Sequence, residues 1–284
     1  MNTLIQRDIL NWYKENKRKL PWRETADPYS IVVSELMLQQ TQVDRVIPKY
    51  HAFLERFPTL QALAAARAAD VIDAWAGLGY NRRALYLHRF AQEVVRTFGG
   101  IIPHHIEQLQ ELPGIGPYTS RALLCFGFGK DVPVVDINIK RIYSRLFFRG
   151  EGTEPELLTV AREMVPIRQG IVWNNALMDF GSLVCTDKPR CGGCPLRKQC
   201  SAFAAGVPEK YVKPKPQSRF LGSDRSYRSL IVKELRKAND FRLSVSSVWA
   251  LKPAGKSDEW FEGILRGLER DGLLVSSDEW FSLP

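Results

Sequence analysis

Four of the five cysteines in the 284-residue chain lie in one stretch, CTDKPRCGGCPLRKQC, as Cys185, Cys191, Cys194 and Cys200. Four thiolates at such close spacing can hold a [4Fe–4S] cluster or a tetrahedral zinc ion. Structural zinc sites usually take two close pairs of ligands from separate segments, whereas one compact loop supplies all four here. The spacing therefore favours a [4Fe–4S] cluster, with zinc or a metal-free loop as alternatives. The fifth cysteine, Cys125, lies in an apolar helix and is expected in the core.

Two carboxylates stand in apolar surroundings that could adapt them to catalysis. Glu35 lies in the helical segment SELMLQQTQV, where it is either exposed on a polar stripe or buried. Burial would raise its pKa, which suits a general acid. Asp136 follows the apolar run VPVV and precedes a helix, so it is expected to cap that helix, and a cap also fixes the direction of the carboxylate. One protonated and one ionised carboxylate can break a glycosidic bond through an oxocarbenium-like transition state, but the sequence alone does not bring the two together.

The segment LPGIGPYTSRALL, residues 112–124, ends one helical pattern and starts another. Gly114 and Gly116 allow a tight turn and a close approach of the backbone to a ligand. The amides of such a hairpin and the N-terminus of the next helix suit a DNA phosphate, which they bind without reading bases. We therefore predict a helix–hairpin–helix phosphate site, with an ordinary turn between core helices as the alternative.

Helices are expected to position these residues. Apolar periodicity predicts helices over residues 4–18, 29–40, 42–56, 59–66, 68–76 and 82–97. No segment before residue 240 shows the sustained alternation of a strand. The first two thirds of the chain should therefore be all-helical.

The last part of the chain has a different organisation. Residues 207–222 contain three prolines, four Lys or Arg residues and few apolar ones, which is typical of a linker. Beyond the linker we expect helices over 225–237 and 257–271, a short helix or turn over 244–251, and two short strands after Gly272, which should end a helix. This order resembles a winged-helix module over residues 223–284.

The net charge of +9 favours a polyanionic partner, either nucleic acid or an acidic membrane surface. The N-terminal segment lacks the apolar core and cleavage site of a signal peptide, and no apolar run is long enough to span a membrane. We therefore expect a cytoplasmic, nucleoid-associated protein with no membrane contact. Thiols stay reduced in that compartment, which argues against disulfides.

Several of these segments occur together in one known superfamily: LPWRETADPY, SELMLQQTQV, IPKY, FPTL, WAGLGYNRRALYLH, LPGIGPYTSRALL, VVDINIKR, NNALMDFGSLVC and the cysteine loop. The chain resembles the helix–hairpin–helix (HhH-GPD) DNA glycosylases with an iron–sulfur cluster, and most closely the A/G-specific adenine glycosylases, the MutY family. The resemblance covers residues 5 to about 205 in the family's order and spacing.

The resemblance implies an all-α, two-lobed fold over residues 1–206. A six-helix barrel, about residues 24–132, carries the hairpin, and a second lobe joins the N-terminal helix to residues 133–206 and the [4Fe–4S] cluster. DNA lies across the cleft between the lobes, and the target base is flipped into it.

The resemblance also implies roles for single residues. Glu35 corresponds to the family's general acid, which protonates the departing purine. Asp136 corresponds to the carboxylate that stabilises or captures the sugar cation. The other matched positions are Asn138 in the aspartate motif, the duplex-wedging residues Gln40 and Tyr80, and the base-pocket residues Trp22, Arg23 and Asn175.

Position 118 bears on the reaction type. Glycosylases of the endonuclease III type carry a lysine there, whose amine attacks the sugar and then cleaves the strand through a Schiff base. The chain has Tyr118, which predicts hydrolysis to an abasic site without strand cleavage.

The chain departs from the family pattern in several places. The first cysteine gap is one residue shorter than usual, Asn81 replaces a second tyrosine, and Ile137 replaces a glycine. Adenine glycosylases also end in a Nudix-like β-domain that reads 8-oxoguanine, and the winged-helix-like module stands in its place.

We expect a monofunctional, monomeric DNA glycosylase of base excision repair. It would remove adenine opposite guanine or 8-oxoguanine from double-stranded DNA. Removal of thymine, uracil or another deaminated base opposite guanine is the alternative, because a tyrosine at position 118 also occurs in T/G mismatch glycosylases. A non-catalytic iron–sulfur DNA-binding protein is disfavoured because Glu35 and Asp136 are both present.

Overall fold

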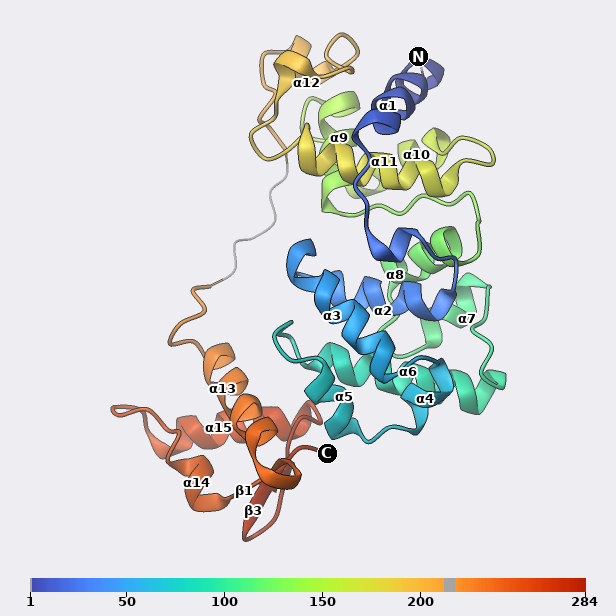
Figure 1. Ribbon diagram of the computed structural model, residues 1–284. Helices are drawn as coiled ribbons and strands as arrows, with labels where there is room; N and C mark the ends of the chain where they lie inside the picture. The colour runs from blue at the N-terminus through green and yellow to red at the C-terminus, as the bar shows by residue number, and fades with distance from the viewer. Residues whose placement is uncertain (1, 212–217) are drawn as a thin grey trace. The chain divides into compact units, whose positions relative to one another are not determined.

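The computed structural model describes residues 2–211 and 218–284. Its described part is mostly helical, which confirms the predicted fold class (Figure 1). The α-helices are α1 (Asn2–Asn16), α2 (Pro28–Leu38), α3 (Val43–Arg56), α4 (Leu60–Ala65), α5 (Ala68–Ala74), α6 (Arg82–Phe98), α7 (Ile106–Glu111), α8 (Pro117–Ala122), α9 (Ile137–Phe148), α10 (Glu154–Met164), α11 (Gly170–Leu183), α12 (Ser201–Ala204), α13 (Asp224–Lys237), α14 (Val245–Trp249) and α15 (Asp258–Arg270). The strands are β1 (Arg242–Ser244), β2 (Val275–Ser276) and β3 (Trp280–Ser282).

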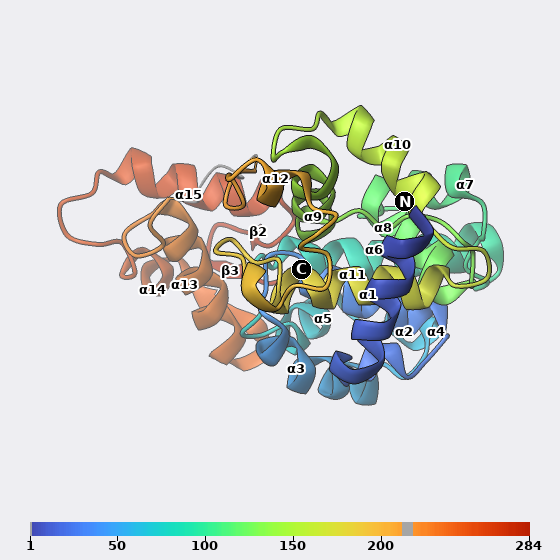
Figure 2. The same ribbon diagram turned by 90° about the horizontal axis from the view of Figure 1, so that it is seen from above.

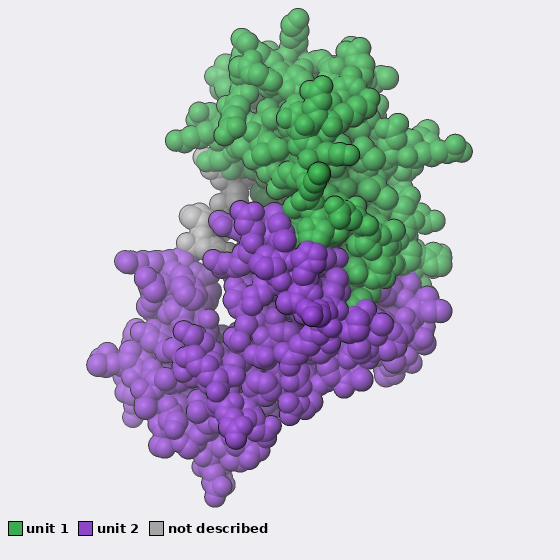
Figure 3. Space-filling view, in the orientation of Figure 1, with its two compact units in different colours: residues 1–31, 104–110, 115–215 green, residues 32–103, 111–114, 216–284 purple. Residues whose placement is uncertain are grey.

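The chain divides into two compact units, each assembled from separated segments (Figure 3). The first unit contains residues 1–31, 104–110 and 115–215. The second contains residues 32–103, 111–114 and 216–284. The predicted linker over 207–222 includes residues 212–217, which lie outside the described residues; residues 207–211 belong to the first unit and 218–222 to the second.

The core of the first unit forms where α1 packs across α11, and Figure 2 shows the two helices crossing. Ile5 and Ile9 lie one helical turn apart and are both buried, so they form a single apolar stripe on α1. Trp12 extends this stripe and meets Phe180 of α11 edge to face, with ring centroids 5.2 Å apart. The first helix of the chain therefore completes a core built mainly from α9, α10 and α11.

In the second unit, α4 and α5 pack against the long helix α6. Trp75 follows α5 and is fully buried, with its ring edge to face against Phe53 of α3 at 5.9 Å. Gly99 ends α6 in the left-handed conformation, with φ of 61°.

Residues 223–284 follow the order of a winged-helix module: α13, β1, α14, α15, β2 and β3. The strands form one antiparallel sheet in the order β1-β3-β2, with Leu243 opposite Phe281. The sequence predicts β2 and β3, which flank one turn, but not β1, which pairs with β3 across about 40 residues of chain and has no local turn signal. Gly272, with φ of 71°, follows α15 as expected for a helix-ending glycine.

No helix in the described part of the chain combines the length and apolar character needed to cross a bilayer.

Candidate active site

Asp136 caps the first turn of α9, as predicted. One carboxylate oxygen accepts the backbone N–H of Ile139 at 2.8 Å, and the other accepts Nδ2 of Asn138 at 2.7 Å. Burial raises the pKa of the Asp136 carboxyl, and these two hydrogen bonds oppose that shift. The cap therefore fixes the direction of a carboxyl whose pKa stays raised, because desolvation outweighs the hydrogen bonds.

A chain of hydrogen bonds links this cap to the cysteine loop. Asn138 Oδ1 accepts a guanidinium N–H of Arg141 at 2.8 Å, and Arg141 Nε donates to the carbonyl of Cys185 at 2.7 Å. Arg141 also donates to the carbonyl of Gly181 at 2.7 Å. A Cβ on Gly181 would lie 2.7 Å from that of Asn138, so α9 and α11 approach this closely only because position 181 is glycine.

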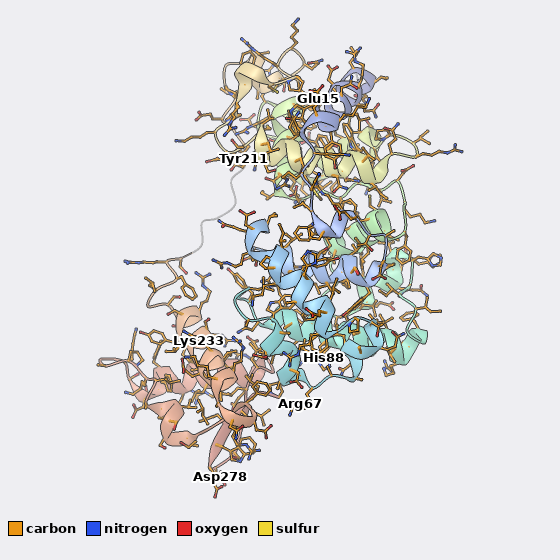
Figure 4. The ribbon with its side chains drawn as sticks, viewed as in Figure 1. Glu15, Arg67, His88, Tyr211, Lys233 and Asp278 are labelled. Carbon is orange, nitrogen blue, oxygen red and sulfur yellow. The ribbon has the colours of Figure 1, made fainter. Side chains whose placement is uncertain are left out.

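Arg145 holds the start of the cysteine loop. Its buried guanidinium donates to the carbonyls of Thr186 at 2.5 Å, Asp187 at 2.9 Å and Glu209 at 3.2 Å. It also lies 3.5 Å from the sulfur of Cys185. Tyr211, labelled in Figure 4, places its ring 4.9 Å from this guanidinium. A single arginine therefore joins the loop to the segment that precedes residue 212.

All four loop cysteines line one apolar pocket. Its other lining residues are Arg145, Val184, Pro189, Arg190, Arg197, Phe203 and Pro208. Burial raises the pKa of Cys185 and Cys191, and it raises the pKa of Cys194 to about 12. Among the described residues, no three His, Cys, Asp or Glu side chains are close enough together to hold a single metal ion. The loop therefore gathers the four thiols around one apolar space.

Glu35 lies on α2 and is only 7% exposed. Its neighbours Leu36 and Met37 are also buried. Of the two positions expected for Glu35, exposed on a polar stripe or buried, the structure therefore has the buried one. Glu35 belongs to the second unit and Asp136 to the first.

The two wedge residues carried over from the resemblance share an unusual backbone. Gln40 has φ of 57° and Tyr80 has φ of 48°, although neither is glycine. Both are exposed, Tyr80 to 39%. Non-glycine residues in this conformation need support from their surroundings, and here the support is a buried arginine.

Arg83, near the start of α6, ties both wedge loops together. It donates to the carbonyls of Leu36, Met37 and Gln39 from one side, at 2.7, 3.0 and 2.5 Å. From the other side it donates to the carbonyls of Leu78 and Gly79, at 3.3 and 3.1 Å. Burial lowers the pKa of Arg83 to about 10, so it remains charged at neutral pH.

The sequence does not single out Arg83. It stands beside Arg82, which is exposed, and only its place on the apolar face of α6 distinguishes the two. Its ring contacts complete the site, because the guanidinium lies 5.5 Å from the Trp75 ring and 5.4 Å from the Tyr80 ring.

The predicted hairpin has the glycine chemistry that the sequence indicates. Gly114 has φ of 78°, and a Cβ there would lie 2.8 Å from that of Tyr86. Gly116 is extended and precedes α8, with Pro117 in its first turn. Tyr118 is half-buried in that turn and packs beside the small core of Ala122, Cys125 and Val134. Cys125 is fully buried, as predicted.

The three base-pocket candidates lie in the first unit. Trp22 and Asn175 are both buried. Arg23 is committed to Asp179, to which it donates two hydrogen bonds at 2.8 and 2.9 Å. Arg18 adds a third at 2.6 Å. Burial would raise the pKa of Asp179, but the hydrogen bonds from the two arginines outweigh it and hold that pKa below its usual value. The guanidinium of Arg23 thus anchors the segment after α1.

Comparison with known proteins adds to this geometry. Residues 33–166 match the family described as HhH-GPD superfamily base excision DNA repair protein. An adenine DNA glycosylase of Mycolicibacterium smegmatis is 40% identical over 285 residues, covering 97% of this chain and 94% of the relative. The chain belongs to the adenine DNA glycosylase family.

A human adenine DNA glycosylase is 39% identical over 217 residues, covering 70% of this chain and 39% of the relative. Among solved structures, a thermostable thymine-DNA glycosylase is 29% identical with a TM-score of 0.68, covering 72% of this chain and 97% of that one. A non-covalent endonuclease III–DNA complex is 18% identical with a TM-score of 0.64, which supports the fold alone. The mycobacterial member of the adenine DNA glycosylase family is thus similar to this chain through nearly all of residues 223–284 as well.

Proposed function

We propose that this chain is a monofunctional DNA glycosylase that hydrolyses the N-glycosidic bond of adenine in a mismatched pair of double-stranded DNA. The opposing base would be guanine or 8-oxoguanine. The observation that carries the proposal is the similarity over 97% of the chain to an adenine DNA glycosylase. The chain also retains both carboxylates that the chemistry needs, Glu35 and Asp136.

In this mechanism, Glu35 donates a proton to the departing purine. Its side chain is only 7% exposed, so the proton that a general acid donates is shielded from bulk water. Asp136 stabilises the positive charge that develops on the sugar, and the hydrogen bonds from Ile139 and Asn138 fix its direction. Water then completes the hydrolysis and leaves an abasic site.

Tyr118 supports hydrolysis rather than strand cleavage. Its phenol cannot form the Schiff base through which an amine-bearing glycosylase cleaves the strand. Tyr118 lies in the first turn of α8, directly after the hairpin. DNA treated with this protein should therefore remain uncut until alkali or heat is applied.

We further propose that the four cysteines hold a [4Fe–4S] cluster. The apolar pocket that all four cysteines line suits such a group, and one compact loop supplies every ligand. When bound, the cluster would cross-link the loop through Cys185, Cys191, Cys194 and Cys200. The positive charges of Arg145 and Arg197 beside the pocket would balance the four thiolates.

The test of the catalytic assignment uses Glu35→Gln and Asp136→Asn. Each should lower single-turnover adenine release from an A·G duplex by about 10³-fold or more, while the Kd for that duplex changes little. Glu15→Gln is the matched control, because Glu15 is an exposed carboxylate on α1 (Figure 4). Release that survives both substitutions would remove these residues from the mechanism.

A second candidate, release of thymine or uracil opposite guanine, has support in the similarity to a thermostable thymine-DNA glycosylase. A panel of duplexes separates the two. The panel pairs adenine with 8-oxoguanine, guanine or cytosine, and thymine, uracil or hypoxanthine with guanine. We expect the fastest release from the adenine duplexes, and faster release of thymine or uracil would reverse the order of the candidates.

A further inference from the structure

The C-terminal module shares a core with the helices of the second unit. Ile231 on α13 and Leu265 on α15 belong to the same buried cluster as Ile72 on α5 and Leu85 on α6. The backbone N–H of Ala69 donates to the carbonyl of Pro284 at 2.7 Å. Arg236 on α13 pairs with Asp73 on α5 at 3.1 Å. The position of α13 relative to α5 and α6 is therefore set by packing.

The parts of a winged helix that usually meet DNA are acidic in this module. In a helix–turn–helix pair the second helix reads the major groove, and here that helix is α15. Its exposed face carries Asp258, Glu259 and Glu262, of which Asp258 pairs with Lys252 at 2.9 Å and Glu262 with Arg266 at 3.1 Å, and Arg270 is exposed in its last turn. Together with Asp278 and Glu279 of the wing, these groups leave the two elements with more carboxylates than cations. The turn between β2 and β3 carries Asp278 at its tip (Figure 4). Carboxylates at these positions repel phosphates, so neither α15 nor the wing suits a DNA backbone.

The N-terminal end of α13 lies beside Tyr80, to which the resemblance gives a wedging role, and it also contacts the first turn of α15, where Trp260 Nε1 donates to Asp224 at 3.2 Å. Arg225, in the first turn of α13, donates to the hydroxyl of Tyr80 at 3.2 Å. Its other guanidinium nitrogen donates to the carbonyl of Ser218 at 2.6 Å. One side chain thus joins the exposed ring of Tyr80 to the segment that enters α13.

This entering segment exposes two large apolar side chains. Phe220 is 51% exposed and Leu221 is 72% exposed. They project from a turn closed by Ser223, whose hydroxyl donates to the carbonyl of Phe220 at 2.6 Å. Arg219 is exposed on the same turn. Apolar and cationic side chains together fit the base faces and phosphates of unstacked DNA.

We propose that Tyr80, Arg219, Phe220, Leu221 and Arg225 form one DNA-contacting surface, which we call the α13 patch. In it, Phe220 and Leu221 pack against a base of the duplex beside the Tyr80 wedge. Arg219 contacts a phosphate, and Arg225 positions Tyr80 while adding positive charge. The C-terminal module then contributes to mismatch binding through the N-terminal end of α13 rather than through the exposed face of α15. This inference rests on the proposed function, because the ligand is that enzyme's duplex.

The test compares full-length variants on a fluorescein-labelled duplex with one A·G mismatch. The double substitution Phe220→Ala with Leu221→Ala removes only exposed side chains, so it should leave thermal unfolding unchanged. It should weaken Kd by about tenfold, in line with loss of base stacking. Arg219→Ala should weaken binding less and lower the slope of log K against log salt by about 1, as expected for one lost phosphate contact.

Matched controls come from the same chain. Arg266→Ala removes an exposed arginine from α15 of the same module, and Ile167→Ala removes an apolar side chain of the other unit that is 85% exposed. Both should bind within about twofold of the unchanged protein. Arg225→Lys keeps the positive charge but loses the planar guanidinium, whose two nitrogens bond Tyr80 and Ser218 separately. It should therefore retain most of the affinity for the duplex but position Tyr80 less well, which should slow adenine release.

The outcomes separate this inference from the proposed function. If the unchanged protein releases adenine, and the Phe220/Leu221 and Arg219 variants bind as tightly as the Arg266 control, the α13 patch is wrong and the glycosylase assignment stands. If the unchanged protein binds the duplex but releases no adenine, the proposed function fails, and the same binding series still decides whether the patch touches DNA.

Discussion

Two buried arginines, Arg83 in the second unit and Arg145 in the first, hold loops in the same manner. Each donates to several backbone carbonyls, and each lies close to an aromatic ring, Tyr80 and Tyr211 respectively. In both, Nε has no hydrogen-bond partner among the described residues. The difference lies in what else supports each loop. Arg145 holds a loop that a metal cluster would also cross-link, whereas Arg83 joins two loops that both carry a left-handed, non-glycine residue.

The comparison shows which of these loops depends on a single arginine to keep its conformation. The cysteine loop has four proposed ligands besides the bonds of Arg145. Between the wedge loops, the described hydrogen bonds include one from the Thr41 hydroxyl to the Leu78 carbonyl at 3.3 Å, in addition to those of Arg83. The wedge should therefore be the more sensitive of the two to loss of its arginine.

The largest effect in this comparison should come from Arg83→Met. It leaves several buried carbonyls without donors, and the free energy of unfolding should fall by about 3 kcal/mol, as measured by urea denaturation. Adenine release should fall by about 100-fold, because Gln40 and Tyr80 lose their common support. Arg145→Met in the cluster-loaded protein should lose less stability but should lower the iron-to-protein ratio.

Arg82→Met is the matched control for that pair, since Arg82 is the exposed neighbour of Arg83, and it should change stability by only about 0.5 kcal/mol. A greater loss of stability in Arg145→Met than in Arg83→Met would reverse the comparison.

An intermediate effect should follow Asn138→Ala, which removes one ligand of the Asp136 carboxylate and one acceptor of Arg141, while the bonds of Arg141 to the Cys185 and Gly181 carbonyls remain. The Asn138 amide stabilises the ionised form of Asp136, so its removal should raise the already raised pKa of that carboxyl further. Because the reaction needs the carboxylate, activity is lost as the pH falls through this pKa. The acid limb of the pH–rate profile should therefore shift to higher pH, and an unshifted limb would remove Asn138 from the control of Asp136.

The smallest effect should come from Tyr211→Leu, which removes the ring beside Arg145. This substitution tests how much the aromatic contact adds to the support of the cysteine loop in the first unit. Loss of one partly desolvated cation–π contact should cost about 1 kcal/mol in thermal unfolding. Tyr211→Phe keeps the ring and serves as the control. Equal destabilisation by the two substitutions would show that the hydroxyl, and not the ring, makes the contact.

The sequence predicts the features that depend on the chemistry of one residue and its neighbours in the chain. The helices, the capping role of Asp136, the turn at Gly114 and the burial of Cys125 all follow from local chemistry. The apolar setting of Glu35 narrows its environment to two choices, of which the structure has the buried one.

The features that the sequence does not predict depend on contacts between distant segments. Arg83 and Arg145 look like ordinary helix arginines until their loops are placed. Gln40 and Tyr80 carry no residue signal for a left-handed backbone, because their conformation is set by the loops around them. The pairing of Arg23 with Asp179, which lies 156 residues further along the chain, also has no signal in the sequence.

The discontinuity of both units also sets an order of events during synthesis on the ribosome. The apolar face of α5, with Ala69 and Ile72, is covered by α13 and later elements that are made about 160 residues afterwards, roughly 8–30 s at typical elongation rates. Until then this face is a hydrophobic surface that no other segment covers. The same holds for the apolar stripe of α1 until α11 has been synthesised. Neither unit can close vectorially from its N-terminus, so a nascent chain stalled before residue 231 exposes surface that the finished enzyme hides.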